Sequence, residues 1–272
     1  MPLAKKMLSY SWPILILGIA GILNQTAGYI IFPYVYKNSD AHTQLGIFGA
    51  ASKIAMIMSM ITQAFRYAYE PFVFGKARDK DNKETYARAM KFFIIFTLLA
   101  FLVVMGYMDV LRHIIGRDYW VGLEVVPIVM AGGIMTGVYF NLSFWYKLID
   151  KTIWGAYFSG IGCAVIIGIN VIFVPKYGYI ACAWAGFLGN ATAMVLSYIV
   201  GQRKYPIDYP LKSIGVYVLI GGLFFAIISY TNANLSVAAA LGINTLVIIL
   251  FIAHVLYHDF PLQQLRKRFG KK

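Results

Sequence analysis

Long apolar spans separated by short polar connections constrain the fold of this chain more than any other feature. A helix needs about 20 residues to cross a hydrocarbon core ~30 Å thick, and every span is near or beyond that length, the third and the seventh being the shortest. We therefore expect an all-α, polytopic membrane protein of eight transmembrane helices. The eight spans are Ser9–Tyr36, Leu45–Phe74, Phe92–Met108, Glu124–Tyr146, Ile153–Val174, Tyr179–Val200, Ile214–Tyr230 and Val237–Tyr257.

Basic residues are distributed unevenly between the two sides of this predicted topology. Eighteen of the 24 Lys and Arg residues lie on the terminal tails or on alternate connections, four lie on the other connections, and only Lys53 and Arg66 lie inside a span. Because Lys and Arg are enriched on the cytoplasmic side of membrane proteins, both termini are predicted to be cytoplasmic. The chain has a net charge of +13, but its basic residues flank apolar spans instead of forming a stripe on a soluble domain. We therefore expect membrane lipid and not nucleic acid as a partner.

Acidic and catalytic groups provide negative evidence about function. The acidic residues lie in connections or at span ends, with Glu70 near the cytoplasmic end of the second span. An ion-driven exporter usually needs a carboxylate at mid-membrane depth, which this chain alone does not supply. The longest cytoplasmic connection, Lys76–Lys91, carries no catalytic constellation and no phosphate-binding glycine loop, and we interpret it as a solvated hinge. The sequence therefore does not indicate an enzyme.

Cysteine and histidine also give no evidence of a cofactor. Cys163 and Cys182 both lie inside spans, where a small apolar role is expected and a disulfide is not indicated. His254 and His258 share a helix face at the end of the last span, beside Asp259. Without further soft or carboxylate ligands nearby, this pair is interpreted as interfacial, and no metal or other cofactor is expected.

The second span carries a polar stripe along one side. At 100° per residue, five of its polar residues fall within about 60° of one another, and Lys53 lies ~80° from Gln63. Lys53 is predicted to lie ~12 Å below the outer helix end, where a cation facing lipid costs ~3 kcal/mol, so it should face protein, water or an anionic ligand. Arg66 and Glu70 are spaced to form an i,i+4 ion pair. The stripe consists of Ser52, Ser59, Gln63, Arg66 and Glu70.

Uncharged amide side chains occupy the middle of several other spans. Most of them are expected to form hydrogen bonds across helices, each contributing ~0.6 kcal/mol. These residues are Asn24, Gln25, Asn141, Asn170, Asn190 and Asn244.

Three segments resemble a known family. They are Tyr10–Asn24, then Leu45–Lys53 continuing through Gln63–Phe72, and finally Asn170–Gly178 followed by Ala181–Ala185. In this order and spacing, they resemble the C-terminal lobe of polysaccharide flippases, which handle O-antigen and other lipid-linked oligosaccharides. These flippases belong to the multidrug/oligosaccharidyl-lipid/polysaccharide exporter superfamily. The resemblance implies a six-helix lobe over residues 1–203, and two additional transmembrane helices with a basic cytoplasmic tail over residues 204–272.

The resemblance also implies a function and a binding site. Such proteins flip lipid-linked oligosaccharide across the bacterial plasma (inner) membrane for the synthesis of surface polysaccharide, including lipopolysaccharide. The expected substrate is an undecaprenyl-diphosphate-linked glycan, with Lys53 and secondarily Arg66 contacting the diphosphate. Gln63, Ser59 and Asn24 are then expected to meet sugar hydroxyls or an opposing lobe, which is either a missing N-terminal lobe or a second copy.

Alternatives to this function remain open at the level of sequence. The chain could be a truncated lobe that lacks independent activity or needs a separate partner half. It could instead be an ion-coupled drug exporter, or a membrane enzyme of glycan assembly, against which the lack of interfacial catalytic groups argues.

Overall fold

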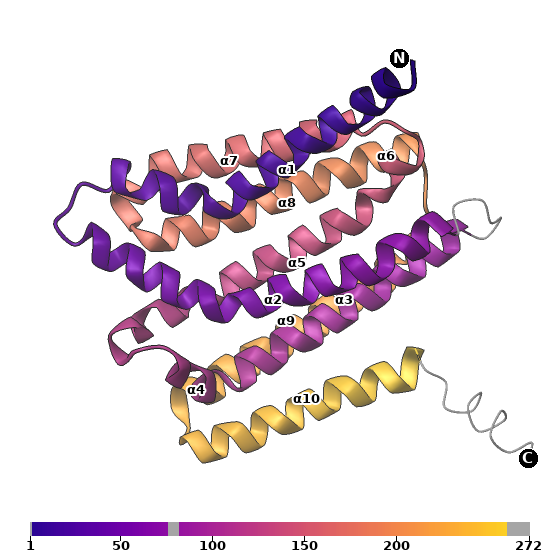
Figure 1. Ribbon diagram of the computed structural model, residues 1–272. Coiled ribbons are helices and arrows are strands. Elements are labelled where there is room, and N and C mark those ends of the chain that lie inside the picture. Colours follow the sequence, from indigo (N-terminus) through magenta and orange to yellow (C-terminus); the bar gives the residue numbers. More distant parts are fainter. Residues whose placement is uncertain (1, 76–81, 260–272) are drawn as a thin grey trace, which may run out of the picture. The chain divides into compact units, whose positions relative to one another are not determined.

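The computed structural model describes residues 2–75 and 82–259 (Figure 1). These residues form helices and turns without a strand, which confirms the all-α fold class. Seven of the described helices are long and apolar enough to cross a membrane. The remaining expected span, Ser9–Tyr36, falls on α1 (Pro2–Val35), and many side chains in its first half lie outside the described part of the chain. The count of eight crossings therefore stays a prediction.

Each expected span falls on helical residues, although the fourth covers two helices that meet at Ser143, and the bounds differ most at the third. There the helix begins at Asn82, well before the expected Phe92, so the interpretation of Lys76–Lys91 as a hinge is wrong from Asn82 onward. Lys, Glu and Arg are good helix formers, and Arg88 pairs with Glu84 one turn earlier at 2.7 Å, so the helix extends beyond its apolar part. Residues 76–81, and the basic tail within 260–272, lie outside the described residues.

The other elements follow in chain order. They are α2 (Ala41–Gly75), α3 (Asn82–Gly106), α4 (Met108–Leu111), the 3-10 segments η1 (Arg112–Ile114) and η2 (Arg117–Val125), α5 (Val126–Leu142), α6 (Phe144–Leu148), α7 (Ile153–Tyr177), α8 (Tyr179–Lys204), α9 (Leu211–Asn234) and α10 (Val237–Asp259).

The chain divides into two compact units. Unit 1 comprises Met1–Met90 and Ile115–Tyr209, and unit 2 comprises Lys91–Ile114 and Pro210–Lys272. Unit 2 thus contains the second part of α3 together with α9 and α10. The expected division into a six-helix lobe over 1–203 and two trailing helices over 204–272 comes from the family resemblance and not from contacts within the chain. It stays a prediction.

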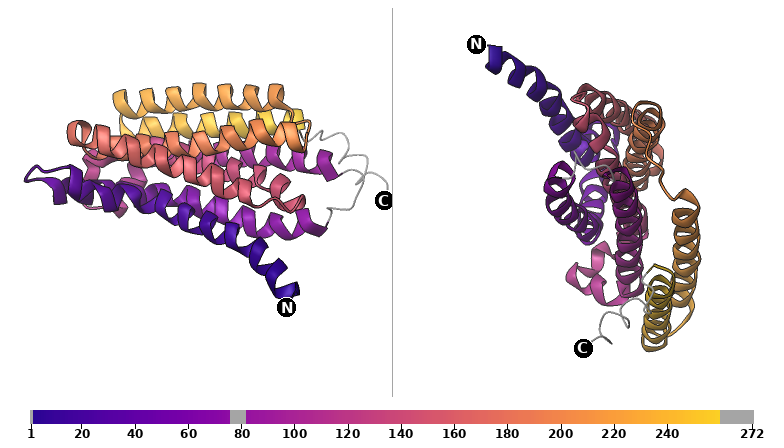
Figure 2. Two further views of the ribbon diagram at one scale, coloured as in Figure 1. Left: turned by 90° about the horizontal axis from the view of Figure 1, so that it is seen from above. Right: turned by 90° about the vertical axis from the view of Figure 1, so that its right-hand side faces the viewer.

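Unit 1 is a helical bundle in which α8 packs against both α5 and α7, while α1 packs on α7 and α2 packs on α5 (Figures 1 and 2). Glycines allow α7 and α8 to approach closely. A Cβ atom added at Gly162 would lie 2.9 Å from the carbonyl oxygen of Gly189, closer than such contacts occur. The two helix backbones therefore touch because neither residue carries a side chain.

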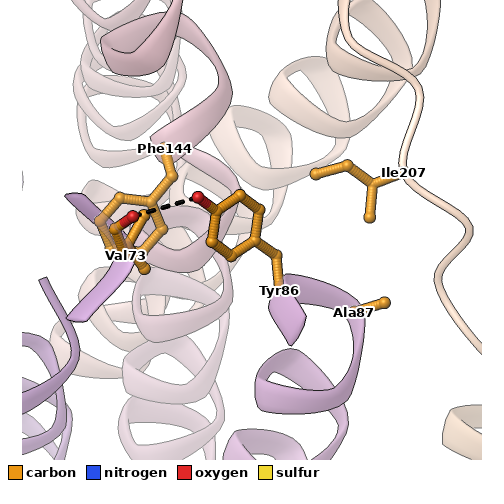
Figure 3. Close-up of a cluster of buried hydrophobic side chains, with 5 residues drawn as sticks. All are labelled: Val73, Tyr86, Ala87, Phe144 and Ile207. Atoms are coloured by element: carbon orange, nitrogen blue, oxygen red, sulfur yellow. Dashed lines mark hydrogen bonds between the residues drawn. The ribbon is translucent and has the colours of Figure 1, made fainter. Parts of the chain in front are cut away.

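A cluster of buried side chains joins the end of α2 to the start of α3 and to α6 within unit 1 (Figure 3). The Tyr86 hydroxyl donates a hydrogen bond to the Val73 carbonyl oxygen at 3.1 Å. That carbonyl belongs to the last turn of α2, where the helix itself provides no partner, so Tyr86 caps the helix end. Phe144, Ala87 and Ile207 complete the cluster.

Unit 2 is held together by a polar network between its three long helices. Asn244 donates from Nδ2 to the Gly106 carbonyl oxygen at 2.9 Å and to Oδ1 of Asn232 at 2.7 Å, while its own Oδ1 accepts from Thr231 at 2.7 Å. Asn232 donates in turn to the Met105 carbonyl oxygen at 3.1 Å. The expectation that Asn244 bonds across helices is confirmed, and the network also satisfies carbonyls at the end of α3.

The far ends of the same helices carry an ionic cluster. Asp259 on α10 accepts hydrogen bonds from Lys91 on α3 and from the Tyr217 hydroxyl on α9, the latter at 2.7 Å. The rings of His254 and His258 lie 4.6 Å apart beside it, as their spacing predicted. Asp259 therefore has two donors to satisfy it, neither of which sequence spacing indicated.

Candidate functional site

Unit 1 contains a cavity of about 270 Å³ between α1, α2, α5, α7 and α8. Apolar surface comes from ring-bearing residues such as Tyr29, Phe48 and Phe140. Among the described residues that line it, none carries a charged group. The polar lining residues are Asn24, Gln25, Ser52, Ser59, Thr62, Gln63, Thr136, Asn170 and Asn190.

Four oxygen atoms on this lining are buried and have no hydrogen-bond partner within the described part of the chain. They are Oδ1 of Asn24, Oγ1 of Thr62, Oε1 of Gln63 and Oδ1 of Asn170. Buried polar groups in proteins are nearly always paired, because an unpaired one costs about 1–3 kcal/mol. These oxygens can therefore accept hydrogen bonds from an occupant of the cavity, because the described residues of unit 1 provide no donor for them.

The orientation of Asn170 is fixed by its other amide atom. Its Nδ2 donates to the Ile166 carbonyl oxygen one turn earlier at 2.8 Å, which leaves Oδ1 as the free group. The side chain is 1% exposed, so water outside the cavity does not reach it. The expectation that mid-span amides bond across helices is therefore wrong for Asn170. It is also wrong for Asn141, which bonds the Gly137 carbonyl oxygen of its own helix.

The structure brings together three of the five side chains predicted for the site and separates the other two. Asn24 on α1, and Ser59 and Gln63 on α2, all line the cavity. Lys53 and Arg66 lie outside the lining. The roles assigned to all five stay predictions, but the arrangement separates the neutral groups from the cations.

Lys53 lies on an exposed side of α2. Its neighbour Ser52 lines the cavity, and successive helix residues point about 100° apart, so the amine is directed away from the lining. Over residues 2–75 and 82–259, no ion pair or hydrogen bond to Lys53 occurs. An exposed amine without a partner among the described residues of unit 1 is available to a group from outside it, and its depth in the membrane stays a prediction.

Arg66 is held by neighbours at one end of the cavity. Its Nε lies 3.5 Å from a carboxylate oxygen of Glu70, which confirms the expected i,i+4 pair. Its guanidinium carbon lies 4.6 Å from the ring centre of Phe140, and that ring lines the cavity. Lys147 on α6 approaches the other oxygen of Glu70 at 2.6 Å, so two cations share one carboxylate. The Lys147 contact was missed, because no spacing within a single helix indicates it.

Several lining residues were not predicted as part of a site. Thr62 is one position from Gln63, while Thr136, Asn170, Asn190 and Cys182 come from α5, α7 and α8. The periodicity of α2 indicates which of its residues share a face, but it does not indicate which helices oppose that face. The only sequence signal for these residues was the presence of polar groups in mid-span, which applied to Asn170 and Asn190.

Comparison with known proteins establishes the fold. No family model matches the chain, and no curated protein matches it. The lipid II flippase MurJ, in an inward closed conformation, is similar in structure with a TM-score of 0.70 and 16% identity, over 92% of this chain and 54% of MurJ. The Vibrio cholerae MATE transporter VcmN, in its bent form, has a TM-score of 0.65 and 13% identity, over 92% of this chain and 63% of VcmN.

Both solved structures belong to the superfamily whose sequence features this chain resembles. At these identities the likeness concerns the fold alone, and the chain spans only 54% and 63% of the two proteins. The chain therefore shares its fold with part of MurJ and with part of VcmN.

Proposed function

We propose that the chain is a membrane transporter, or one half of one, that flips lipid-linked oligosaccharide from the cytoplasmic to the outer leaflet of a bacterial plasma membrane for surface polysaccharide synthesis. The observation that supports this most strongly is a polar cavity within a bundle of apolar, membrane-length helices. Four unpaired buried oxygens reduce the stability of unit 1, and an occupant rich in hydrogen-bond donors offsets that cost. A glycan is such an occupant.

The cations are proposed to meet the charged part of the same substrate. A diphosphate that leaves water for hydrocarbon incurs a large solvation penalty, which a cation directed at it reduces. Lys53 is exposed and unpaired within the described residues, so it is the primary contact. Arg66 already pairs with Glu70 and is the secondary one.

A second protein body is proposed to complete the transporter. Both structural neighbours extend well beyond the length that this chain covers. A separately encoded half or a second copy of this chain would cover the side of α2 that exposes Lys53, and would shield the amine from lipid. We also propose that both termini are cytoplasmic. Most Lys and Arg residues lie on the terminal tails and on the connections that share a side of the membrane with them, and this side is usually the cytoplasmic one.

A chromosomal substitution tests the function in the organism that encodes the chain, where any partner is present. Deletion of the gene and Lys53→Ala are both expected to abolish surface glycan and to make lipid-linked oligosaccharide accumulate. Lys176→Ala serves as a matched control, because it removes a charge of the same kind from an exposed site at the end of α7. Surface glycan that persists after deletion, without accumulation of the lipid-linked precursor, refutes the proposal.

The similarity to a MATE transporter favours a second candidate, an ion-coupled drug exporter. The uncharged lining of the cavity argues against it, because ion coupling usually involves a carboxylate at membrane depth. The same deletion strain distinguishes the two functions. Increased sensitivity to toxic cations with normal surface glycan supports the drug exporter, whereas loss of glycan with unchanged sensitivity supports the flippase.

A further inference from the structure

We infer that the cavity of unit 1 is a subsite for one uncharged sugar ring of the substrate, and that the diphosphate binds outside it. This inference rests on the proposed function and goes beyond it, because it assigns the two parts of the substrate to different places. It departs from the expectation that a single polar stripe recognises both.

The unpaired atoms define what the cavity binds. Oδ1 of Asn170 and Oγ1 of Thr62 belong to side chains that are 1% and 4% exposed, and both line the cavity without a partner in the described residues. A carbonyl oxygen only accepts hydrogen bonds, so Asn170 needs an O–H or N–H donor from its ligand. Asn24 and Gln63 add two further oxygens of the same kind. Sugar hydroxyls and the N–H of an acetamido group are donors of this class.

An anion does not fit this lining. Its oxygens would face the acceptor atom of Asn170, whose orientation is fixed, without a cation beside them, since no charged group lies among the described lining residues. Burying an unpaired charge in such a place costs far more than burying a hydroxyl. Arg66 does not line the cavity, packs against the Phe140 ring and is paired with Glu70, so it does not change this balance.

The size and shape of the cavity suit a single ring. Pockets that hold drug-sized ligands measure about 300–1,000 Å³, and 270 Å³ is just below that range, so the cavity has room for one sugar ring and the remaining rings of an oligosaccharide lie outside it. Aromatic rings cover part of the wall, and amides occupy other parts, matching a ring with apolar C–H faces and a polar edge. Met56 and Ser59 line the cavity and are also exposed, so the cavity opens at α2.

Binding to the purified full chain in lipid nanodiscs tests the inference. The probes are neutral hexoses and N-acetylhexosamines, and the binding of each is measured singly by saturation-transfer NMR. Inorganic pyrophosphate is added as a competing anion. In a separate measurement, the sodium in the buffer is replaced by potassium. At least one neutral sugar is expected to bind, pyrophosphate is expected not to displace it, and the exchange of cations is expected not to change it. A panel in which no sugar binds overturns the inference, and so does binding that pyrophosphate abolishes. An effect of sodium alone, without sugar binding, overturns it as well.

Two matched glycine variants locate the binding. A Cβ atom added at Gly186 or at Gly160 meets no heavy atom within 4 Å, so both positions have space for the start of a side chain, and thermal unfolding of Gly186→Leu and Gly160→Leu checks that both variants fold. Only Gly186 lines the cavity. Gly186→Leu is expected to weaken sugar binding roughly tenfold or more, because its side chain takes up space that the sugar ring needs, and Gly160→Leu is expected to leave binding unchanged. Equal effects of the two variants refute the assignment to the cavity.

The subsite and the function fail in different ways. If deletion of the gene stops glycan export but no sugar binds the purified chain, the flippase function stands and the subsite is wrong. If a neutral sugar binds and Gly186→Leu blocks it, while deletion leaves surface glycan intact, the subsite stands and the flippase function is wrong.

Discussion

Replacing Thr62 by Val should make the protein more stable. Thr62 is 4% exposed, and its Oγ1 has no hydrogen-bond partner in the described part of unit 1. Valine has nearly the same shape, so the change removes an unpaired hydroxyl without opening a cavity or forcing neighbours apart. Most substitutions of a buried polar residue destabilise a protein, which makes the expected sign a sharp test of the unpaired state.

The expected magnitude follows from the contacts of the hydroxyl. A buried unpaired polar group costs about 1–3 kcal/mol, and water in the cavity recovers part of that, so we expect Thr62→Val to raise the free energy of unfolding by about 1 kcal/mol. For a chain of this size, this corresponds to roughly 2–4 °C in Tm. The same variant should bind neutral sugar more weakly, because it removes a group that faces the occupant.

The control is a buried threonine whose hydroxyl is paired. Oγ1 of Thr97 donates to the Phe93 and Ile94 carbonyl oxygens, at 2.9 and 3.1 Å, and the side chain is fully buried. Thr97→Val should therefore lower the free energy of unfolding by about 0.5–1 kcal/mol. Thermal unfolding of both purified variants in the same detergent gives the comparison. If Thr62→Val lowers Tm as Thr97→Val does, the Thr62 hydroxyl is paired in the folded protein and the reasoning about the cavity fails.

Two further substitutions test the contacts that hold unit 1 together. Glu70→Gln should lower the free energy of unfolding by about 2 kcal/mol, because it leaves the largely buried Lys147 amine without its carboxylate. Thermal unfolding in detergent measures the effect, and a Tm equal to that of the unchanged protein would contradict the prediction. Gly162→Ala should destabilise by about 1–3 kcal/mol, because its Cβ meets the Gly189 carbonyl oxygen. Gly168→Ala in the same helix meets nothing within 4 Å and should be neutral or slightly stabilising, so thermal unfolding of the pair separates backbone contact from helix propensity.

The helices were largely predictable from sequence, because apolar length is a direct physical requirement for crossing a bilayer. Hydropathy detects only the part of a helix that lies in hydrocarbon, however. The start of α3 at Asn82 was missed because its first turns carry charged residues that continue the helix into water. Helix propensity and i,i+4 pairs such as Glu84 with Arg88 were the signals available for that extension.

The candidate site was predictable only within one helix. The 100° geometry of α2 correctly placed Ser59 and Gln63 on one face, and it correctly paired Arg66 with Glu70. It did not indicate that α7 and α8 oppose that face, and so Asn170 was expected to bond across helices. Contacts between helices depend on close packing in three dimensions, which residue spacing in one helix does not encode.

The structure shows that the angle between Lys53 and the polar stripe of α2 separates a cation from the uncharged residues that line the cavity. Ser52 lines the cavity and Lys53, the next residue, points about 100° away with a rise of only 1.5 Å. Two adjacent faces of one helix therefore present different chemistry, with uncharged acceptors on one and a cation on the other. A substrate whose diphosphate is joined directly to a neutral sugar has the same two chemistries side by side. The proposed separation of charge from sugar thus requires no large distance, only the turn between consecutive residues of α2.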